Sequence, residues 1–163
     1  MKTNKKNTSF IISVSHAVKG FIDALRRERN LRIHVCIGNL ICYFAYFYGI
    51  SRIQWAILFI AICIVISAEL FNSSIEKAVD TATKEYRTDA MHAKDFAAAA
   101  TLIAAIFAVL IGVTLFGNIS KILRALEAIF TSPIGMLVLF VLIIIDLGIL
   151  TINIKLIKHR RKK

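Results

Sequence analysis

The sequence predicts an all-α integral membrane protein with four spans, on three observations. The chain has 163 residues, of which 58% are hydrophobic, a content too high for an ordinary soluble domain. Four apolar runs, at residues 34–50, 55–72, 97–116 and 134–154, each have about the length that crosses the hydrocarbon core of a bilayer. The basic residues gather outside these runs, which is typical of the segments that flank membrane helices.

The distribution of charge predicts the orientation of the chain. The formal net charge is +11, and of the 21 lysines and arginines eight lie in residues 1–32, four in 73–96 and six in 155–163. By the positive-inside rule these three segments face the cytoplasm, so both termini are expected there. Basic flanks beside spans usually set topology and contact anionic lipids, so we expect no nucleic-acid partner.

The N-terminal segment is expected to be a basic tail followed by a surface helix. Residues 1–8 are polar and are expected to be unstructured. In residues 9–29 apolar side chains recur at helical spacing among polar ones, which predicts an amphipathic helix too polar to span the bilayer. Its basic residues favour a place in the cytoplasmic headgroup layer, and packing against residues 73–96 is the alternative.

The spans carry few polar residues. Asn39 in the first span is interpreted as a residue that forms a hydrogen bond between helices. Residues 120–130 are expected to form a short interfacial helix ahead of the fourth span. Asp146, near the middle of that span, is either protonated and hydrogen-bonded to a neighbouring helix or part of a pathway. The three cysteines lie in apolar runs and are interpreted as packing residues: Cys36, Cys42 and Cys63.

A polar stripe leaves the end of the second span and is the strongest functional signal. At about 100° per residue, Glu69, Asn72, Glu76 and Asp80 fall within an arc of roughly 80° on one helix face. An ionised glutamate costs roughly 3 kcal/mol or more among acyl chains, so Glu69 should face protein, a cation or a substrate. The stripe therefore predicts a functional site that leads from bilayer depth into water.

Glu28 is a second candidate, because it is one acid among four arginines directly before the first span. A border that sets topology is the simpler interpretation. If the surface helix folds back along the membrane, Glu28 can approach Glu76 and Asp80, and such a group of carboxylates favours a divalent cation. Lys94, where the third span begins, is either a border residue or a ligand for a phosphate oxygen.

These residue types suit phosphoryl transfer, although the common nucleotide-binding loops are absent from the sequence. Carboxylates and a lysine can hold a metal ion and phosphates in line with an attacking oxygen. Glu28 and Glu76, on the water side, can hold magnesium with ATP. Glu69, nearest the acyl chains, can take the proton from a lipid hydroxyl.

At these positions the chain resembles the small integral-membrane prokaryotic lipid kinases, the family that includes diacylglycerol kinase and undecaprenol kinase. The signature is Glu69-Leu70-Phe71-Asn72-Ser73-Ser74-Ile75-Glu76 followed by Asp80, with Ser74 in place of the usual alanine. The resemblance covers about residues 9–116. Its further landmarks are Lys19-Gly20, Glu28 with Arg32, Glu85-Tyr86 and Lys94-Asp95.

The resemblance implies a three-span lipid-kinase core at residues 9–116 with Glu69 as catalytic base and with Glu28 and Glu76 as ligands of Mg²⁺ and of the ATP phosphates. It also implies a homotrimer in the bacterial cytoplasmic membrane. Residues 117–163, with the fourth span, lie outside it. The other implied site residues are Asn72, Lys94, Asp95, Glu85, Tyr86, Arg87 and His16 for ATP, Arg32 with Glu69 for the lipid, and Lys19 and Asp80 in support.

The acceptor lipid is the open point of this interpretation. The run Glu28-Arg29-Asn30-x-Arg32-Ile33-His34 is more similar to the undecaprenol kinases of Gram-positive bacteria than to Gram-negative diacylglycerol kinases. The sequence therefore favours undecaprenol, with diacylglycerol as the alternative. A small four-span transporter or scaffold, with Glu69 and Asp146 binding a proton or a cation, is the competing class.

Overall fold

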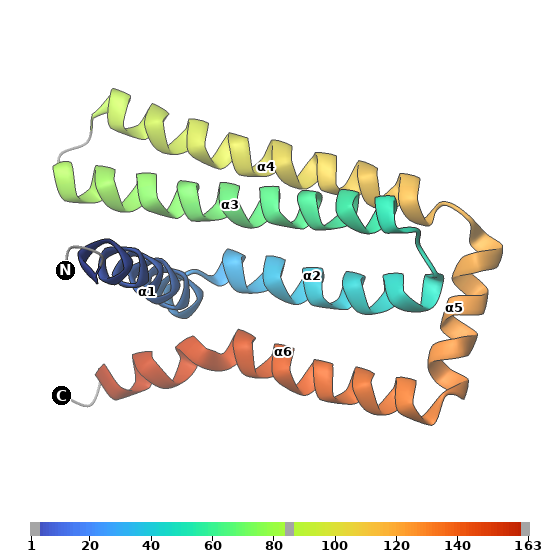
Figure 1. Cartoon of the computed structure of the whole chain (residues 1–163). Coiled ribbons are helices and arrows are strands. Elements are labelled where there is room, and N and C mark those ends of the chain that lie inside the picture. Colours follow the sequence, from blue (N-terminus) through green and yellow to red (C-terminus); the bar gives the residue numbers. More distant parts are fainter. Residues whose placement is uncertain (1–3, 84–86, 161–163) are drawn as a thin grey trace.

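The computed structural model describes the backbone of residues 4–83 and 87–160, and the side chains of residues 10–83 and 87–152. This part of the chain forms helices joined by short turns (Figure 1). The helices are α1 (Asn4–Arg27), α2 (Arg29–Tyr48), α3 (Arg52–Ala82), α4 (Thr88–Phe116), α5 (Ile119–Thr131) and α6 (Pro133–Arg160).

The predicted fold class is confirmed, since α2, α3, α4 and α6 are long and apolar enough to cross a membrane. α3 has 31 residues and is therefore about 45 Å long, whereas the hydrocarbon core is about 30 Å thick. Its apolar run cannot fill this length, so its C-terminal turns extend beyond the bilayer. The beginning of α4 is polar in the same way and lies beside these turns (Figure 1).

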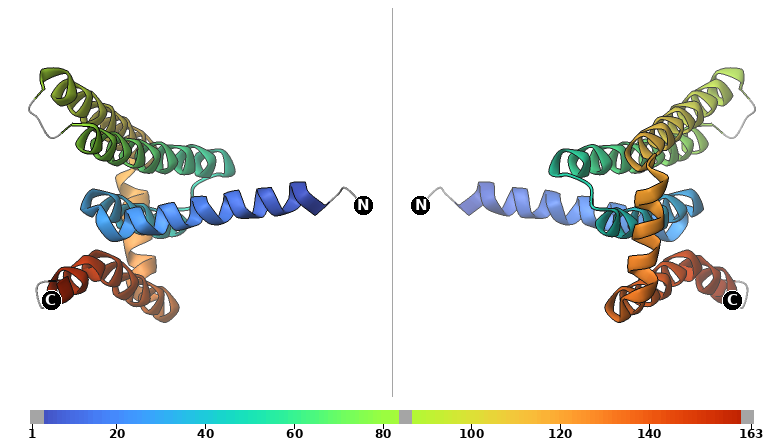
Figure 2. Two further views of the ribbon diagram at one scale, coloured as in Figure 1. Left: turned by 90° about the vertical axis from the view of Figure 1, so that its left-hand side faces the viewer. Right: turned by 90° about the vertical axis from the view of Figure 1, so that its right-hand side faces the viewer.

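The four long helices lie in a row in the order α4, α3, α2, α6 (Figure 1). α3 and α4 form a closely packed antiparallel hairpin, while α6 packs against α2 on the side away from α3. α5 crosses the end of the row opposite the two termini (Figures 1 and 2). The helix α2 therefore packs against α3 on one side and against α6 on the other.

The surface helix differs from its expected bounds. α1 begins at Asn4, so residues 4–8 are helical where the sequence predicted an unstructured tail. These residues include no glycine or proline, and the amphipathic helix extends through them. At its other end α1 stops at Arg27, leaving Glu28 as the residue that joins it to α2.

α1 projects sideways from the row of spans (Figure 2). Its side chains from Phe10 to Asp23 are exposed, including apolar ones such as Phe10 and Ile11. Among the described residues it contacts chiefly α2 and α6, whereas the alternative considered above expected packing against residues 73–96. An uncovered apolar face on a helix perpendicular to the spans is the arrangement expected at a membrane surface.

The end of the row opposite the termini holds a small core. Buried apolar side chains from α2, α3, α4 and α5 meet there, among them Ala45, Leu58, Leu115 and Ala125. The helix predicted at residues 120–130 is α5, which begins one residue after its cap, Asn118, whose side chain accepts a hydrogen bond from the Lys121 backbone N–H. This core fixes the distance between the far ends of the helices.

Polar contacts attach α6 to α2. The Asn39 amide donates a hydrogen bond of 2.9 Å to Asp146 Oδ1, and the Tyr43 hydroxyl donates one of 2.8 Å to the backbone oxygen of Gly135. The interhelical role predicted for Asn39 is confirmed. Of the two alternatives for Asp146, the structure has the hydrogen bond to a neighbouring helix.

Candidate active site

The polar stripe of α3 passes from the protein interior to its surface. Glu69 and Asn72 are 3% and 8% exposed, Glu76 is half-buried and Asp80 is exposed. The Asn72 amide nitrogen donates a hydrogen bond of 3.2 Å to Glu76 Oε1, while Asn72 Oδ1 is buried with no hydrogen-bond partner among the described residues. The stripe thus connects a buried carboxylate to the polar end of the helix pair.

Two residues of α2 flank the Glu69 carboxylate. The Asn30 side chain is within hydrogen-bonding range of it, and His34, one helical turn further along α2, lies close enough to act on it electrostatically. Glu28 and Glu76 also act on it electrostatically. Although Glu69 is deeply buried, its surroundings are therefore polar.

Glu28 reaches α3 from the junction of α1 and α2. Its Oε1 atom lies 2.8 Å from Lys77 Nζ, and Lys77 directly follows Glu76 in the chain. Glu28 therefore reaches α3 through Lys77, and among the described residues Glu28, Glu76 and Asp80 do not form a group close enough to hold a metal ion by themselves. The sequence analysis did not identify Lys77, and its place beside Glu76 was the signal that could have found it.

Lys94 joins α4 to the same region, because its ammonium group pairs with the Asp80 carboxylate of α3. Both side chains are partly exposed, and such pairs are worth about 0–1 kcal/mol, so Lys94 can exchange Asp80 for another anion at little cost. Asp95 follows it on the exposed side of α4.

Other predicted residues lie apart from Glu69 within the single chain. Arg32 is buried and donates hydrogen bonds of 3.0 and 3.3 Å to the backbone oxygens of Leu25 and Arg26, so it closes the end of α1. His16 and Lys19 are exposed on α1, the helix that projects from the row (Figure 2). Arg87 is the exposed cap residue of α4, and Glu85 and Tyr86 lie outside the described residues.

The donor set fits magnesium bound together with phosphates. In the described part of the chain, no three His, Cys, Asp or Glu residues are grouped closely enough to hold a metal ion by themselves. In phosphate-transfer sites, however, Mg²⁺ is usually bound by one or two carboxylates, with phosphate oxygens and waters completing the shell. Glu28 and Glu76 are two carboxylates that both lie close enough to Glu69 to act on it electrostatically.

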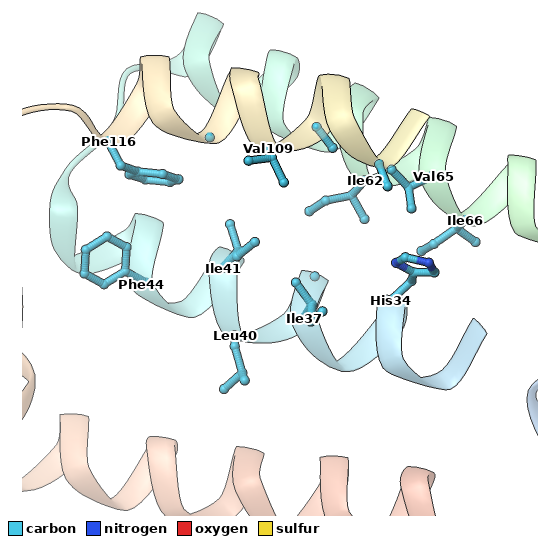
Figure 3. A pocket seen from close by; sticks show the side chains of 14 residues that line it. His34, Ile37, Leu40, Ile41, Phe44, Ile62, Val65, Ile66, Val109 and Phe116 are labelled. Atoms are coloured by element: carbon cyan, nitrogen blue, oxygen red, sulfur yellow. The ribbon is translucent and has the colours of Figure 1, made fainter. Parts of the chain in front are cut away.

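An apolar cavity of about 520 Å³ lies between α2, α3 and α4 (Figure 3). His34 lies at one end, and the rings of Phe44 and Phe116, with centroids 5.4 Å apart, lie at the other. The side chains between these ends are aliphatic, with Ile37 and Ile62 on facing helices. Such a lining is chemically suited to a hydrocarbon chain.

Four candidate spans, a buried carboxylate one helical turn beyond an apolar cavity and a polar stripe leading into water are features expected of a membrane protein that acts on an amphiphile. Residues 15–116 match the family model described as Prokaryotic diacylglycerol kinase. The chain therefore belongs to this family and is a membrane lipid kinase. α5 and α6 lie outside the matched residues.

Known relatives include kinases with different acceptors in their names. The chain is 34% identical to the undecaprenol kinase of Bacillus subtilis over 107 residues, which cover 66% of this chain and 87% of the relative. It is 36% identical to a diacylglycerol kinase of Synechocystis over 105 residues, covering 64% of this chain and 60% of that protein. A diacylglycerol kinase of Helicobacter pylori is 46% identical over 59 residues, 36% of this chain and 46% of the relative. No solved structure matches the chain significantly.

Proposed function

We propose that this lipid kinase transfers the γ-phosphate of ATP, with Mg²⁺, to the hydroxyl group of undecaprenol, giving undecaprenyl phosphate and ADP. One observation carries the proposal: Glu69 is buried beside the polar end of the apolar cavity, and a polar stripe leads from it toward water. A lipid hydroxyl and a water-soluble nucleotide can meet at this point from opposite sides.

In the proposed reaction Glu69 accepts the proton of the lipid hydroxyl. The hydroxyl oxygen forms the new bond to the γ-phosphorus as the bond from that phosphorus to the bridging oxygen of ADP breaks. A positioned general base contributes roughly 10²- to 10⁴-fold to such a step. Magnesium held by Glu28 and Glu76 would supply charge neutralisation at the phosphates. Lys77, which pairs with Glu28 and directly follows Glu76 in the chain, adds a positive charge to this region.

The remaining residues are assigned to the nucleotide and to its support. Lys94 exchanges Asp80 for a phosphate oxygen, which the partial exposure of their ion pair favours. Arg32 supports the lipid site by fixing the end of α1, directly before Glu28. We place the other proposed ligands around ATP: Asn72, Glu85, Tyr86, Arg87, Asp95 and His16, with Lys19 in support.

We also propose a homotrimer in the bacterial cytoplasmic membrane with both termini in the cytoplasm. The orientation follows from the basic segments. The oligomer is favoured by a second cavity of about 370 Å³, which residues of α3 and α4 line, among them Asn72, Ala97 and the exposed Phe71.

The cavity favours a polyprenol over diacylglycerol as the acceptor. Among the residues that line it, His34 alone has a polar side chain, so a lipid is offered hydrogen bonds only at one end. A polyprenol has one hydroxyl group on an apolar chain and needs no more. The two ester carbonyls of diacylglycerol would lose hydration along the lining, at roughly 1–3 kcal/mol for each unpaired group.

The test is transfer of labelled phosphate from ATP by purified protein in detergent, with undecaprenol and diacylglycerol supplied separately and with and without Mg²⁺. We expect magnesium-dependent labelling of undecaprenol in clear excess. Preferential labelling of diacylglycerol would keep the mechanism and reverse the acceptor. No label in either lipid, from protein that is shown to be folded, would overturn the proposed reaction.

A further inference from the structure

We propose that His34 binds the hydroxyl group of the acceptor lipid and orients it toward Glu69. This inference rests on the proposed function, and it assigns a role to a residue that the sequence analysis left without one. His34 is the polar side chain in the lining of the apolar cavity, and it stands at the end of the cavity nearest the buried carboxylate (Figure 3).

The position of His34 follows from the register of α2. Residues at alternating spacings of four and three along a helix share one face. On α2 this face begins at Asn30, beside Glu69, and continues along the wall of the cavity. Its members are Asn30, His34, Ile37, Ile41 and Phe44. His34 is thus the point at which the face changes from polar to apolar.

The opposing face of α3 has the same order. Ile62, Val65 and Ile66 line the cavity, and Glu69 lies beyond them, one turn from Val65 and outside the lining. In Figure 3 the His34 ring lies close to Ile66, the cavity-lining residue of α3 that is nearest to Glu69 in the chain. A hydroxyl group at the end of the cavity therefore meets His34 before it meets Glu69.

The chemistry of an alcohol matches this pair. A hydroxyl group donates one hydrogen bond and accepts up to two, and a neutral imidazole has one N–H donor. The hydroxyl can accept from the imidazole of His34 while it donates its proton to the Glu69 carboxylate. This arrangement leaves a lone pair of the oxygen directed away from both residues, toward the phosphate.

The ligand class implied is a primary alcohol on a long apolar chain. An apolar side chain at position 34 would leave the hydroxyl without its donor at the edge of a nonpolar cavity. The net value of one hydrogen bond is about 1 kcal/mol, which corresponds to roughly five- to tenfold in binding. A change of this size in lipid binding is therefore expected when His34 is replaced by an apolar residue.

The kinetic experiment compares His34→Leu with His34→Gln in the full-length protein. Leu has a side chain of similar size but no hydrogen-bond donor, whereas the Gln amide retains an N–H donor. We expect His34→Leu to raise KM for undecaprenol roughly tenfold with KM for ATP unchanged, and His34→Gln to recover most of this loss. Equal values of kcat and KM in His34→Leu and wild type would overturn the proposal, as would equal loss in both variants or a matching rise in KM for ATP.

A binding experiment separates this inference from the proposed reaction. Tritiated geranylgeraniol is titrated into Glu69→Gln protein in detergent, with and without His34→Leu, so that no turnover is needed. Weaker binding in the double variant supports the role of His34 even if the wild type phosphorylates a different lipid. Equal binding in the two proteins would overturn it, whatever the wild type transfers.

Discussion

Two buried carboxylates flank α2, and the structure gives them opposite surroundings. Glu69 of α3 is 3% exposed and Asp146 of α6 is 5% exposed, so burial does not distinguish them. Asp146 Oδ1 accepts a hydrogen bond from Asn39, and its backbone oxygen faces the Cys36 thiol at 3.7 Å. Glu69 has polar and ionisable neighbours, an apolar cavity nearby and a stripe toward water. Access, more than depth, separates the candidate site from a structural contact.

The comparison also bears on the transporter alternative, in which both acids bind a proton or a cation. α2 lies between α3 and α6 (Figure 1), and the two carboxylates contact different faces of it. Asn39 and Tyr43 share the face toward α6, whereas His34 and Ile41 share the face toward α3. The helix α2 therefore lies between the two acids. The family assignment supports a kinase and not a transporter.

The largest expected effect is that of Glu69→Gln. The amide is isosteric and cannot accept the hydroxyl proton, so turnover should fall at least roughly 100-fold. ATP binding should remain, because the nucleotide is assigned to the water side of the stripe. The measurements are labelled phosphate transfer to undecaprenol and equilibrium binding of ATP with Mg²⁺. Asp146→Asn is the matched control, and normal turnover in Glu69→Gln would end the assignment of Glu69 as base.

The next effect is that of Glu76→Gln and Glu28→Gln on magnesium-dependent nucleotide binding. Loss of one of two carboxylate ligands should weaken it by at least roughly tenfold. Calorimetric titration of ATP with and without Mg²⁺ measures the change. Lys77→Gln is the control for Glu28→Gln, because it removes the same ion pair and keeps the carboxylate. If Lys77→Gln weakened magnesium dependence as much, Glu28 would act through its pair with Lys77 and not as a ligand.

A smaller effect is expected from filling the cavity with Gly112→Leu. A Cβ atom at Gly112 meets open space, and Gly112 lines the cavity. The larger side chain should raise KM for undecaprenol roughly tenfold while the helix becomes slightly more stable, by up to about 1 kcal/mol. Gly148→Leu in α6 is the control, since Gly148 also faces open space but is not part of this lining. Equal effects of the two variants on KM would remove the cavity from the lipid site.

Much of the fold followed from periodicity and run length. Local patterns of apolar residues predict the four spans, the amphipathic surface helix and α5. These predictions do not depend on contacts with the rest of the chain. The stripe from Glu69 to Asp80 was predictable for the same reason, because its members share one helix face. Their assigned functions stay predictions.

What the sequence did not reveal are the partners between helices. Asn39 was identified as an interhelical residue, but nothing local indicates that its acceptor lies in α6, more than 100 residues away. The pairing of Glu28 with Lys77 likewise depends on the angle between α1 and α2. The hydrogen bonds from Arg32 to the backbone at the end of α1 could not be read from its sequence run, and its role at the lipid site stays a prediction. Tertiary packing decides each of these cases.

The smallest expected effect concerns Asp146, the carboxylate that the comparison treats as structural. Asp146→Leu removes the acceptor of Asn39 and leaves a half-buried amide without its partner, so the protein should lose about 1 kcal/mol of stability. Asp146→Asn keeps an acceptor oxygen and should change stability by less than about 0.5 kcal/mol. Unfolding in mixed detergent micelles measures both variants.

Phosphate transfer at a temperature where both are folded should be within about twofold of wild type, because α2 separates this contact from Glu69. A large loss of turnover in stable Asp146→Asn protein would place both carboxylates in one functional unit, and the distinction between the two faces of α2 would fail.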